Sequence, residues 1–485
     1  MKKKHDTWTR TMAAVIGLLA PASAISFVRS REQLRRYTGA SMAGHNRVRP
    51  SRRSADAIIS RDNAMLVARA RDLVRNNVVV AGAIRKITNN VIHTGIKPQA
   101  QIRDKGGKPS PINQDIERTW KTWDMSNEFR QVQELVLRHW WIDGEVIVHL
   151  WIDQARLDEG VCPLRMTILE QDMLDNTVHG TLSNGNTAKH GIEFDAKSDP
   201  VAYHILTTHP GDTGILSLGT DTKRIEARDI LHIFVPERAS QTRGVSLMAP
   251  VIQEMADLSE YQVNERIAAR LASAFGIFVK STTDLQGNAL GGIAGDADES
   301  AEPEMSDYIE PGRIQYLPQG TEIQTAKSDR PGTTYEPYVK TSLKEASVGF
   351  GLRYGNFSHD YADSSYSSER AGALDERRGW IGQQRVIIDK LCMPVMRRFL
   401  EVAAASGLLP TVVISAPIIW QTPGWPWTDP TKDSKAAQME LDLHVTTHRK
   451  IAAARGDDWD DVVEQLAREK QILKEHGLLE ENENE

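Results

Sequence analysis

The chain of 485 residues is poor in cysteine, and Cys162 and Cys392 are its only two. Two cysteines in a chain of this length do not make the disulfide framework of a small secreted protein, which points to a reducing compartment. They also lack the short spacing of metal-ligand pairs. We therefore expect both to be buried thiols with a structural role.

Motifs that bind phosphate or activate a nucleophile are also missing. The run Gly106–Ser110 resembles a phosphate loop, but Pro109 stands in the wrong place and the upstream glycine is absent. The sequence contains neither G-x-G-x-x-G after a strand nor a G-x-S-x-G elbow. Nothing in the sequence therefore supports an enzyme, and we expect no cofactor and no bound metal.

Two groups of residues have the types that chemistry uses, but a structural explanation is favoured for each. His444 and His448 have the i, i+4 spacing of zinc ligands on a predicted helix, yet Val445 replaces the glutamate of H-E-x-x-H. Two exposed histidines on a solvated helix are the favoured interpretation. Asp143 and Glu145 flank Gly144 and could supply paired carboxylates, although a hairpin turn leading into a strand explains them better.

The net charge of −6 hides an uneven distribution. The segment Asp284–Glu310 contains eight acidic residues and no Lys or Arg, and without it the net charge would be +2. Four further acidic residues lie in the tail that begins at Leu478. The rest of the chain is therefore mildly basic, with two acidic appendages.

The N-terminus has two interpretations. Lys2–Lys4 precede an apolar run, Met12–Ala24, which ends in an A-x-A pattern typical of a secretory signal. However, Trp8–Arg10 intervene and Pro21 interrupts the run, which favours a short surface helix followed by the basic arm Arg29–Arg53. The run is too short and too broken to span a membrane, so we expect no membrane association.

The hydrophobic pattern predicts an α+β domain followed by long helices. Ser246–Phe275 can form an unbroken helix because it has no glycine and its one proline, Pro250, lies in the first turn. At ~1.5 Å per residue such a rod would be about 45 Å long. A second rod is expected at Thr333–Phe350, and a third at Ser368–Ala405 with a kink at Pro394.

Other elements follow from the same patterns. Helices are expected at Arg61–Val91, split at Asn76–Asn77, at Ile116–Trp141 and at Ser434–Lys474. The expected strands are Glu145–Ile152, Arg165–Leu169, Val201–Leu206, Ile230–Val235, Gly276–Lys280 and Arg313–Tyr316.

Several short motifs resemble those of one known family. They are Arg69–Asn77, Asp143–Glu145, His232–Phe234 with Glu237 and Arg238, Gln241–Val245, Tyr366–Ser368 with Arg370, and Asp429–Pro430 with Lys432 and Asp433. In this order and spacing the sequence resembles, almost end to end, the lambda-type family of portal proteins (head-to-tail connectors) of tailed bacteriophages. The start of the chain, Gly17–Tyr37, is similar to this family as well, which argues against a signal peptide.

The resemblance implies a portal fold with wing, stem, clip and crown regions. By that likeness, 1–60 would be a basic arm, 61–245 the wing, 246–275 and 333–350 the stem helices, and 276–332 the clip with an acidic flexible loop. Residues 351–430 would hold a tunnel loop, a long kinked helix and the rest of the wing, and 431–485 the crown.

The resemblance also implies partners. The family forms rings, usually of twelve copies, at one capsid vertex of the virion, assembled in the cytoplasm of the host bacterium. Double-stranded DNA passes through the axial channel without sequence specificity during packaging and ejection. The large subunit of terminase and then a head-to-tail adaptor dock on the ring, which also contacts the major capsid and scaffold proteins.

The likeness suggests two sets of site residues. Candidates for the channel and tunnel loop are Lys340, Lys344, Arg353, Tyr354, His359, Tyr361 and Tyr366. Candidates for docking the motor or adaptor on the clip are Asp284, Asp296, Asp298, Glu299, Glu302, Glu304, Asp307 and Glu310. Two rival functions stay open from the sequence: a multimeric head or scaffold protein that is not a portal, and a secreted hydrolase behind a signal peptide.

The acidic segment Asp284–Glu310 allows two interpretations, a disordered insertion or a surface that recruits a basic partner, and we favour the insertion. Deleting Gln286–Ser306 should therefore leave DNA packaging unchanged, as measured by the amount of DNA protected inside capsids. Loss of packaging would instead support recruitment.

Overall fold

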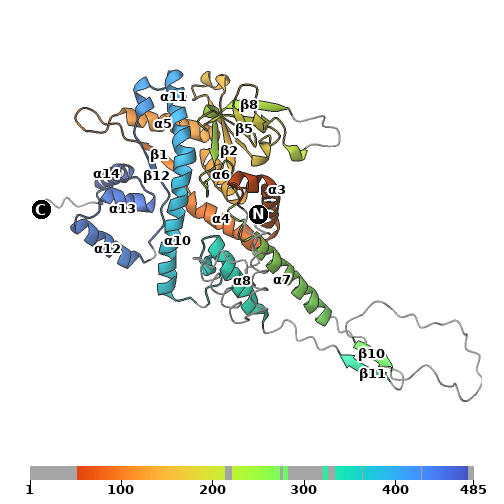
Figure 1. Cartoon of the computed structure of the whole chain (residues 1–485). Coiled ribbons are helices and arrows are strands. Elements are labelled where there is room, and N and C mark those ends of the chain that lie inside the picture. The colour runs from red at the N-terminus through yellow and green to blue at the C-terminus, as the bar shows by residue number, and fades with distance from the viewer. Residues whose placement is uncertain are drawn as a thin grey trace, which may run out of the picture. The chain divides into compact units, whose positions relative to one another are not determined.

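A computed structural model describes residues 52–212, 221–273, 277–281, 321–325, 334–362, 364–427 and 429–478 (Figure 1). The candidate docking residues from Asp284 to Glu310, the strand expected at Arg313–Tyr316 and nearly all of the N-terminal arm lie outside these ranges. The described residues from Ala55 onward belong to one compact unit. None of the described helices combines the length and the apolar composition required to cross a membrane.

The first helices form where the apolar periodicity predicts them. Helix α3 (Ala55–Asn76) and helix α4 (Val78–Val91) are separated at Asn77, whose side chain accepts hydrogen bonds from the Val79 and Val80 amides. This N-cap confirms the expected split, because it begins a new helix. The next helical zone is also divided, into α5 (Ile112–Asn127) and α6 (Phe129–Ile142), at Glu128, which has a φ of 52°.

All strands in the described residues pair in antiparallel fashion. A three-stranded sheet has the order β3 (Leu164–Leu169), β2 (Val146–Ile152), β9 (Ile230–Ile233). The five-stranded sheet runs through β4 (Gly180–Thr181), β5 (Thr187–Lys189), β6 (Ile192–Phe194), β7 (Pro200–Leu206) and β8 (Thr222–Glu226). Two-stranded pairs join β1 (Lys97–Ala100) with β12 (Ile418–Gln421), and β10 (Ile277–Ser281) with β11 (Thr321–Thr325). The mixture of helices with antiparallel sheets confirms the α+β class.

The main core lies where α5, α6 and the later helix α11 (Met393–Ala405) meet. Its centre is aromatic: the rings of Trp120 and Trp123 lie 5.1 and 5.5 Å from the ring of Phe399, and 5.4 and 5.8 Å from that of Phe129. Such contacts at these separations are favourable beyond the area they bury. A smaller cluster, including Ile192 and Tyr203, belongs to the five-stranded sheet.

Helix α7 (Ile252–Ser273) is shorter than the sequence predicts. The expected start at Ser246 is wrong, because residues 247–251 form turns. The Leu247 amide donates to the Trp141 carbonyl, and the Ser246 hydroxyl accepts from the Met248 amide. These bonds tie the segment to α6 and leave it out of the helix, while Phe275 lies outside the described residues.

Helix α8 (Tyr335–Gly349) confirms the second rod, and it packs against α7 through tyrosines. The ring of Tyr261 on α7 lies 5.9 Å from that of Tyr335 and 4.7 Å from that of Tyr338. The two helices therefore form a pair that leads to and from the β10–β11 hairpin.

The third rod is α10 (Tyr366–Ile387), a π-helical turn (Ile388–Cys392) and α11 in unbroken sequence (Figure 1). The π turn comes just before Pro394, where the Met393 amide donates to the Ile388 carbonyl. Proline has no amide hydrogen, and a π turn is one way for a helix to continue past this defect. Leu374 and Ile381 on α10 are 49% and 54% exposed, whereas Trp380 and Ile387 on α10 and most large apolar side chains of α11 are buried.

The chain ends in three helices, α12 (Pro430–Asp442), α13 (His448–Arg455) and α14 (Trp459–Glu475). They contribute little to the core, since Ala452 is their one buried residue among the positions described.

A buried charged cluster joins the sheet to the segment before α7. Glu145 is fully buried and accepts hydrogen bonds from Arg243 Nε at 2.6 Å and the Gly244 amide at 2.6 Å, and its carboxylate lies 2.9 Å from His232 Nε2. Burial alone would raise the pKa of Glu145, but the charge of Arg243 and the contacts with His232 hold it at about 2. The carboxylate is therefore ionised inside the protein.

Two glycines make this cluster possible. Gly144 has a φ of +88°, and a Cβ atom on it would lie 2.1 Å from the Val245 carbonyl carbon. A Cβ atom on Gly244 would lie 2.3 Å from the Gly144 carbonyl oxygen. The hairpin turn expected at Asp143–Glu145 is thus wrong, because the triplet instead connects α6 to β2.

Replacing Glu145 with Gln should cost ~3–5 kcal/mol of unfolding free energy, since Arg243 would keep a buried charge without its partner. The folded pKa of Glu145 lies below its unfolded value, so its contribution is complete above pH ~4.5 and is lost as the pH falls towards ~2. Urea unfolding measured between pH ~4.5 and ~2 should show that the wild type loses unfolding free energy as the pH falls. The Glu145→Gln variant should lack this loss. Glu159→Gln, at an exposed position, is the control and should change little. Equal stability of both variants would contradict the assignment.

Candidate channel segment

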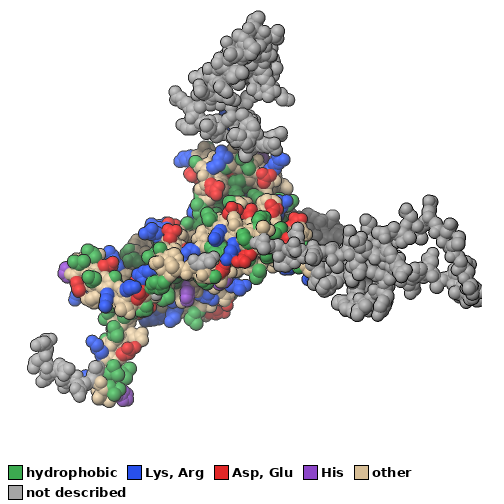
Figure 2. Space-filling model, turned by 90° about the horizontal axis from the view of Figure 1, so that it is seen from below, with side chains coloured by type: hydrophobic (Ala, Val, Ile, Leu, Met, Phe, Trp, Pro, Cys, Tyr) green, Lys and Arg blue, Asp and Glu red, His purple; other side chains and the backbone are tan. Residues whose placement is uncertain are grey.

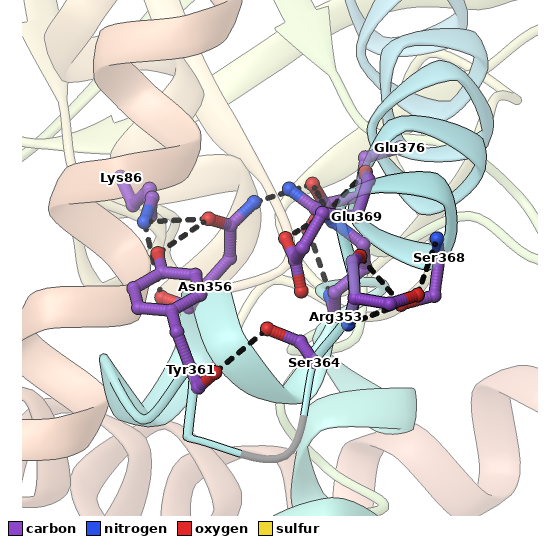
Figure 3. Close-up of polar contacts among 9 residues, drawn as sticks. Lys86, Arg353, Asn356, Tyr361, Ser364, Ser368, Glu369 and Glu376 are labelled. Carbon is purple, nitrogen blue, oxygen red and sulfur yellow. Dashed lines mark hydrogen bonds and ion pairs between the residues drawn. The ribbon is translucent and has the colours of Figure 1, made fainter.

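Most of the candidate channel residues lie in or beside one segment, residues 353–368, which we call the channel segment. It connects α8 to α10 and contains the short helix α9 (Tyr354–Ser358). Figure 3 shows Arg353, Asn356 and Tyr361 meeting side chains from α4 and α10. The segment is therefore held by helices that are distant in sequence.

Arg353 fixes the beginning of the channel segment to α10. Its amide donates to Glu376 Oε1 at 2.7 Å, and its Nε donates to Glu376 Oε2 at 2.9 Å. Its guanidinium also bonds the Glu369 carbonyl at 2.7 Å and the Glu369 carboxylate. The arginine passes over Gly372, where a Cβ atom would lie 2.2 Å from Arg353 Cδ. The charge of this candidate channel residue is thus already paired with two carboxylates.

Asn356 is the second anchor. Lys86 on α4 donates to its side-chain oxygen at 2.9 Å and to its carbonyl at 3.2 Å, while the Tyr361 hydroxyl donates to the same side-chain oxygen at 3.1 Å (Figure 3). The Asn356 amide group in turn donates to Glu376. Burial lowers the pKa of Lys86, and the nearby charge of Arg353 adds to this shift against the opposing effect of Glu376.

The tip of the channel segment is organised by Asp360. Its carboxylate accepts from the Ala362 amide at 3.1 Å and from the Tyr354 hydroxyl at 3.1 Å, and it lies 3.7 Å from Lys340 Nζ on α8. The backbone hydrogen bond from Ala362 is the largest reason that the pKa of Asp360 is lowered, followed by the bond from Tyr354. His359 precedes it with a φ of 60° and is exposed.

The remaining candidates differ in their surroundings. Lys344 is exposed, with Nζ 5.4 Å from the centre of the Tyr354 ring, a cation–π arrangement. Tyr366 lies at the far end of the segment, where its hydroxyl donates to Asp429 at 3.3 Å and Lys432 Nζ lies 5.8 Å from its ring centre. The structure therefore brings Lys340, Lys344 and Tyr354 together and places Tyr366 against α12.

Sequence reasoning missed the partners that hold the segment. Lys86, Glu369 and Glu376 come from helices whose amphipathic patterns gave no reason to single out these charges. The one available signal was Gly372, a glycine inside a long predicted helix, which often marks a close approach.

Potential metal ligands occur elsewhere. Glu170, Asp172 and His209 offer ligand atoms within 4.8 Å of one another. The guanidinium of Arg71 already lies 2.9 Å from Glu170 and 2.7 Å from Asp172, so the carboxylates are paired with a cation from the protein. The expectation that His444 and His448 share a helix is wrong, because His444 follows α12 with a φ of 56° and His448 begins α13.

Both cysteines are free and buried, which confirms the sequence expectation. On the face of the molecule in Figure 2, acidic and basic side chains are interspersed over the described residues.

Comparison with known proteins identifies relatives over most of the chain. The model of a family described as phage portal protein, lambda family, matches residues 41–384. The probable portal protein of Halomonas phage phiHAP-1 is 28% identical over 91% of this chain and 85% of that protein. The portal protein of Escherichia phage N15 is 20% identical over 91% and 89%, and portal protein B of Escherichia phage lambda is 21% identical over 88% and 87%.

Solved structures also match. A chain from the virion of a native gene transfer agent particle has a TM-score of 0.41 and 13% identity, covering 82% of this chain and 93% of that one. A chain from the neck of an empty particle of the same kind has a TM-score of 0.44 and 12% identity, covering 80% and 93%.

Replacing Glu376 with Ala should lower the unfolding free energy by about 1–3 kcal/mol, because Arg353 and Asn356 would lose a buried acceptor. The channel segment should also become easier to cleave in limited proteolysis, since its base is no longer fixed to α10. Asp375→Ala, at an exposed position of the same helix, is the matched control. Wild-type cleavage and stability in Glu376→Ala would refute the anchoring role.

Proposed function

This chain belongs to the lambda family of phage portal proteins, and we propose that it assembles into a ring, of twelve copies, at one vertex of the capsid. Portal proteins of this family are structural components of the virion. The observation that carries the proposal is the match of the family model to residues 41–384, together with curated relatives that are portal proteins along most of their length.

In the proposed ring, α7 and α8 are the stem helices and the β10–β11 hairpin belongs to the clip. The tyrosine contacts between α7 and α8 support a rigid stem, because they fix the two helices against each other. The large subunit of terminase and later the head-to-tail adaptor dock at the clip. Helices α12–α14 form the crown, and the α+β body forms the wing, which contacts the major capsid and scaffold proteins.

Contacts between neighbouring copies are supported by exposed apolar side chains on the stem helices. Val263 and Ile267 on α7 are 44% and 47% exposed, and Val348 on α8 is 79% exposed. A ring buries such surfaces head to tail against the next subunit. Single exposed apolar residues are ordinary, but Val263 and Ile267 lie one turn apart on the same face of α7.

Double-stranded DNA passes through the proposed ring without sequence readout, during packaging and ejection. Every lysine or arginine that binds a phosphate adds affinity and salt dependence, which would retard movement. Arg353 in the channel segment is paired with Glu369 and Glu376, and Lys340 on the neighbouring helix α8 is paired with Glu336 and Asp360. This pairing supports a passage that does not grip its cargo. Assembly takes place in the cytoplasm of the bacterial host.

Negative-stain images of the purified full-length protein should show rings with an axial hole, and their class averages should give the subunit count. The double substitution Val263→Glu and Ile267→Glu should disperse the rings, because charged side chains would face the neighbouring subunit. Met125→Glu, which replaces an exposed apolar residue on α5, is the matched control and should still form rings. Filaments or compact dimers of the wild type would count against a portal and favour another multimeric head or scaffold protein.

A further inference from the structure

Lys340 lies between two carboxylates. Its Nζ is 3.2 Å from Glu336 Oε1, one turn earlier on α8, and 3.7 Å from Asp360 Oδ2 at the tip of the channel segment. One ammonium with two carboxylates leaves the group with a net charge of −1. An approaching phosphate would therefore meet a locally negative group at the position of this lysine.

The position of Asp360 is fixed by the fold. The Ala362 amide and the Tyr354 hydroxyl both donate to its carboxylate, and its own amide donates to the Ser358 hydroxyl at 3.1 Å. Tyr354 and Ser358 belong to α9, which is anchored through Asn356 to α4 and α10. The carboxylate is thus held beside α8 by a network that begins at the base of the segment.

The neighbouring cations differ from Lys340 in an informative way. Lys86 is bound to Asn356, and Arg353 is paired with two glutamates. Lys344, one turn after Lys340, has no carboxylate within 4.0 Å among the described residues and rests over the Tyr354 ring. Of the two lysines on this face of α8, one is therefore masked and the other is open to an anion.

We propose that Glu336 and Asp360 mask Lys340 from the DNA backbone, and that this masking determines how weakly the ring holds DNA. The inference rests on the proposed function, because it requires that DNA passes the face that carries α8 and the channel segment. It assigns Asp360 a role in setting affinity, in addition to its structural role in the turn.

The expected consequence follows from counterion release. Each lysine that binds a phosphate steepens the dependence of log K on log salt by about 0.9. In a ring, each subunit contributes its own Lys340. Removing the masking carboxylates from every subunit therefore allows several lysine–phosphate contacts with the same DNA. The ring would then bind DNA more tightly and with a stronger dependence on salt.

The test uses assembled full-length rings and a labelled linear DNA duplex of mixed sequence. The double variant Glu336→Gln and Asp360→Asn removes both charges. The Asp360→Asn side chain keeps one oxygen to accept from the Ala362 amide, and its NH2 group can donate to the Tyr354 hydroxyl in place of the second oxygen. We expect its Kd at ~50 mM salt to fall at least about tenfold and its salt dependence to steepen by about 0.9 or more. Adding Lys340→Gln should return both quantities to the wild-type values.

Asp375→Asn combined with Glu440→Gln is the matched control, because it removes two exposed carboxylates elsewhere on the surface. Three results would each overturn the inference. They are wild-type DNA affinity in the Glu336/Asp360 double variant, an equal gain of DNA affinity in the matched control, and a gain of DNA affinity that persists when Lys340→Gln is added. If the double variant does not form rings, Asp360→Asn alone should show a smaller gain, and no gain would again overturn it.

Images of the same preparations separate this inference from the proposed function. Rings with an axial hole and unchanged DNA affinity in the variant would remove the masking role and leave the portal assignment intact. A wild-type protein that forms no ring would remove both.

Discussion

The fold depends on one buried carboxylate. Glu145 directly precedes β2, and it accepts hydrogen bonds from Arg243 and the Gly244 amide, just before the turns that lead into α7. Next to it, Asp143 accepts two bonds from Arg71 on α3, so helix, sheet and connector meet at adjacent residues. A buried charge is tolerated only when it is paired and hydrogen-bonded. The position of the chain at the start of α7 follows from this requirement, because Gly144 and Gly244 must touch for the pairing to form.

The sequence predicted most elements whose signals are local. The Asn77 cap, the β-rich run of β2 and Pro394 in the first turn of α11 all act within a few residues. The sequence did not predict the structure of segments whose conformation is set by a residue far away in the chain. Residues 246–251 have a helical pattern, but the bond from the Leu247 amide to Trp141 removes them from α7. The turn at Asp143–Glu145 was misjudged for the same reason, since its partners Arg71 and Arg243 are far away in sequence.

The candidate channel residues show the same division. The family resemblance pointed to a segment between two predicted helices, and its place in a channel stays a prediction. The hydrogen-bond partners of its residues could not be predicted from the sequence, because Arg353 contacts Glu376 on α10 and Asn356 contacts Lys86 on α4. Two of the motifs that carried the family resemblance contact each other across 63 residues, through Tyr366 with Asp429 and Arg370 with Asp433. In both pairs a residue of one motif contacts a residue of the other, so these motifs help to hold α10 against α12.

The π turn at Ile388–Cys392 sets how the two halves of the long rod are rotated relative to each other. An α-helix advances by 3.6 residues per turn, so one extra residue in the ladder rotates everything beyond it by roughly 100°. Leu374 and Ile381 are half exposed before the turn, whereas Leu391, Val395 and Phe399 are buried within it or after it. Trp380 and Ile387 on α10 are buried in the same core as Phe399 on α11, so the extra rotation keeps one buried side along the whole rod. Leu374 and Ile381 lie off that side and stay half exposed.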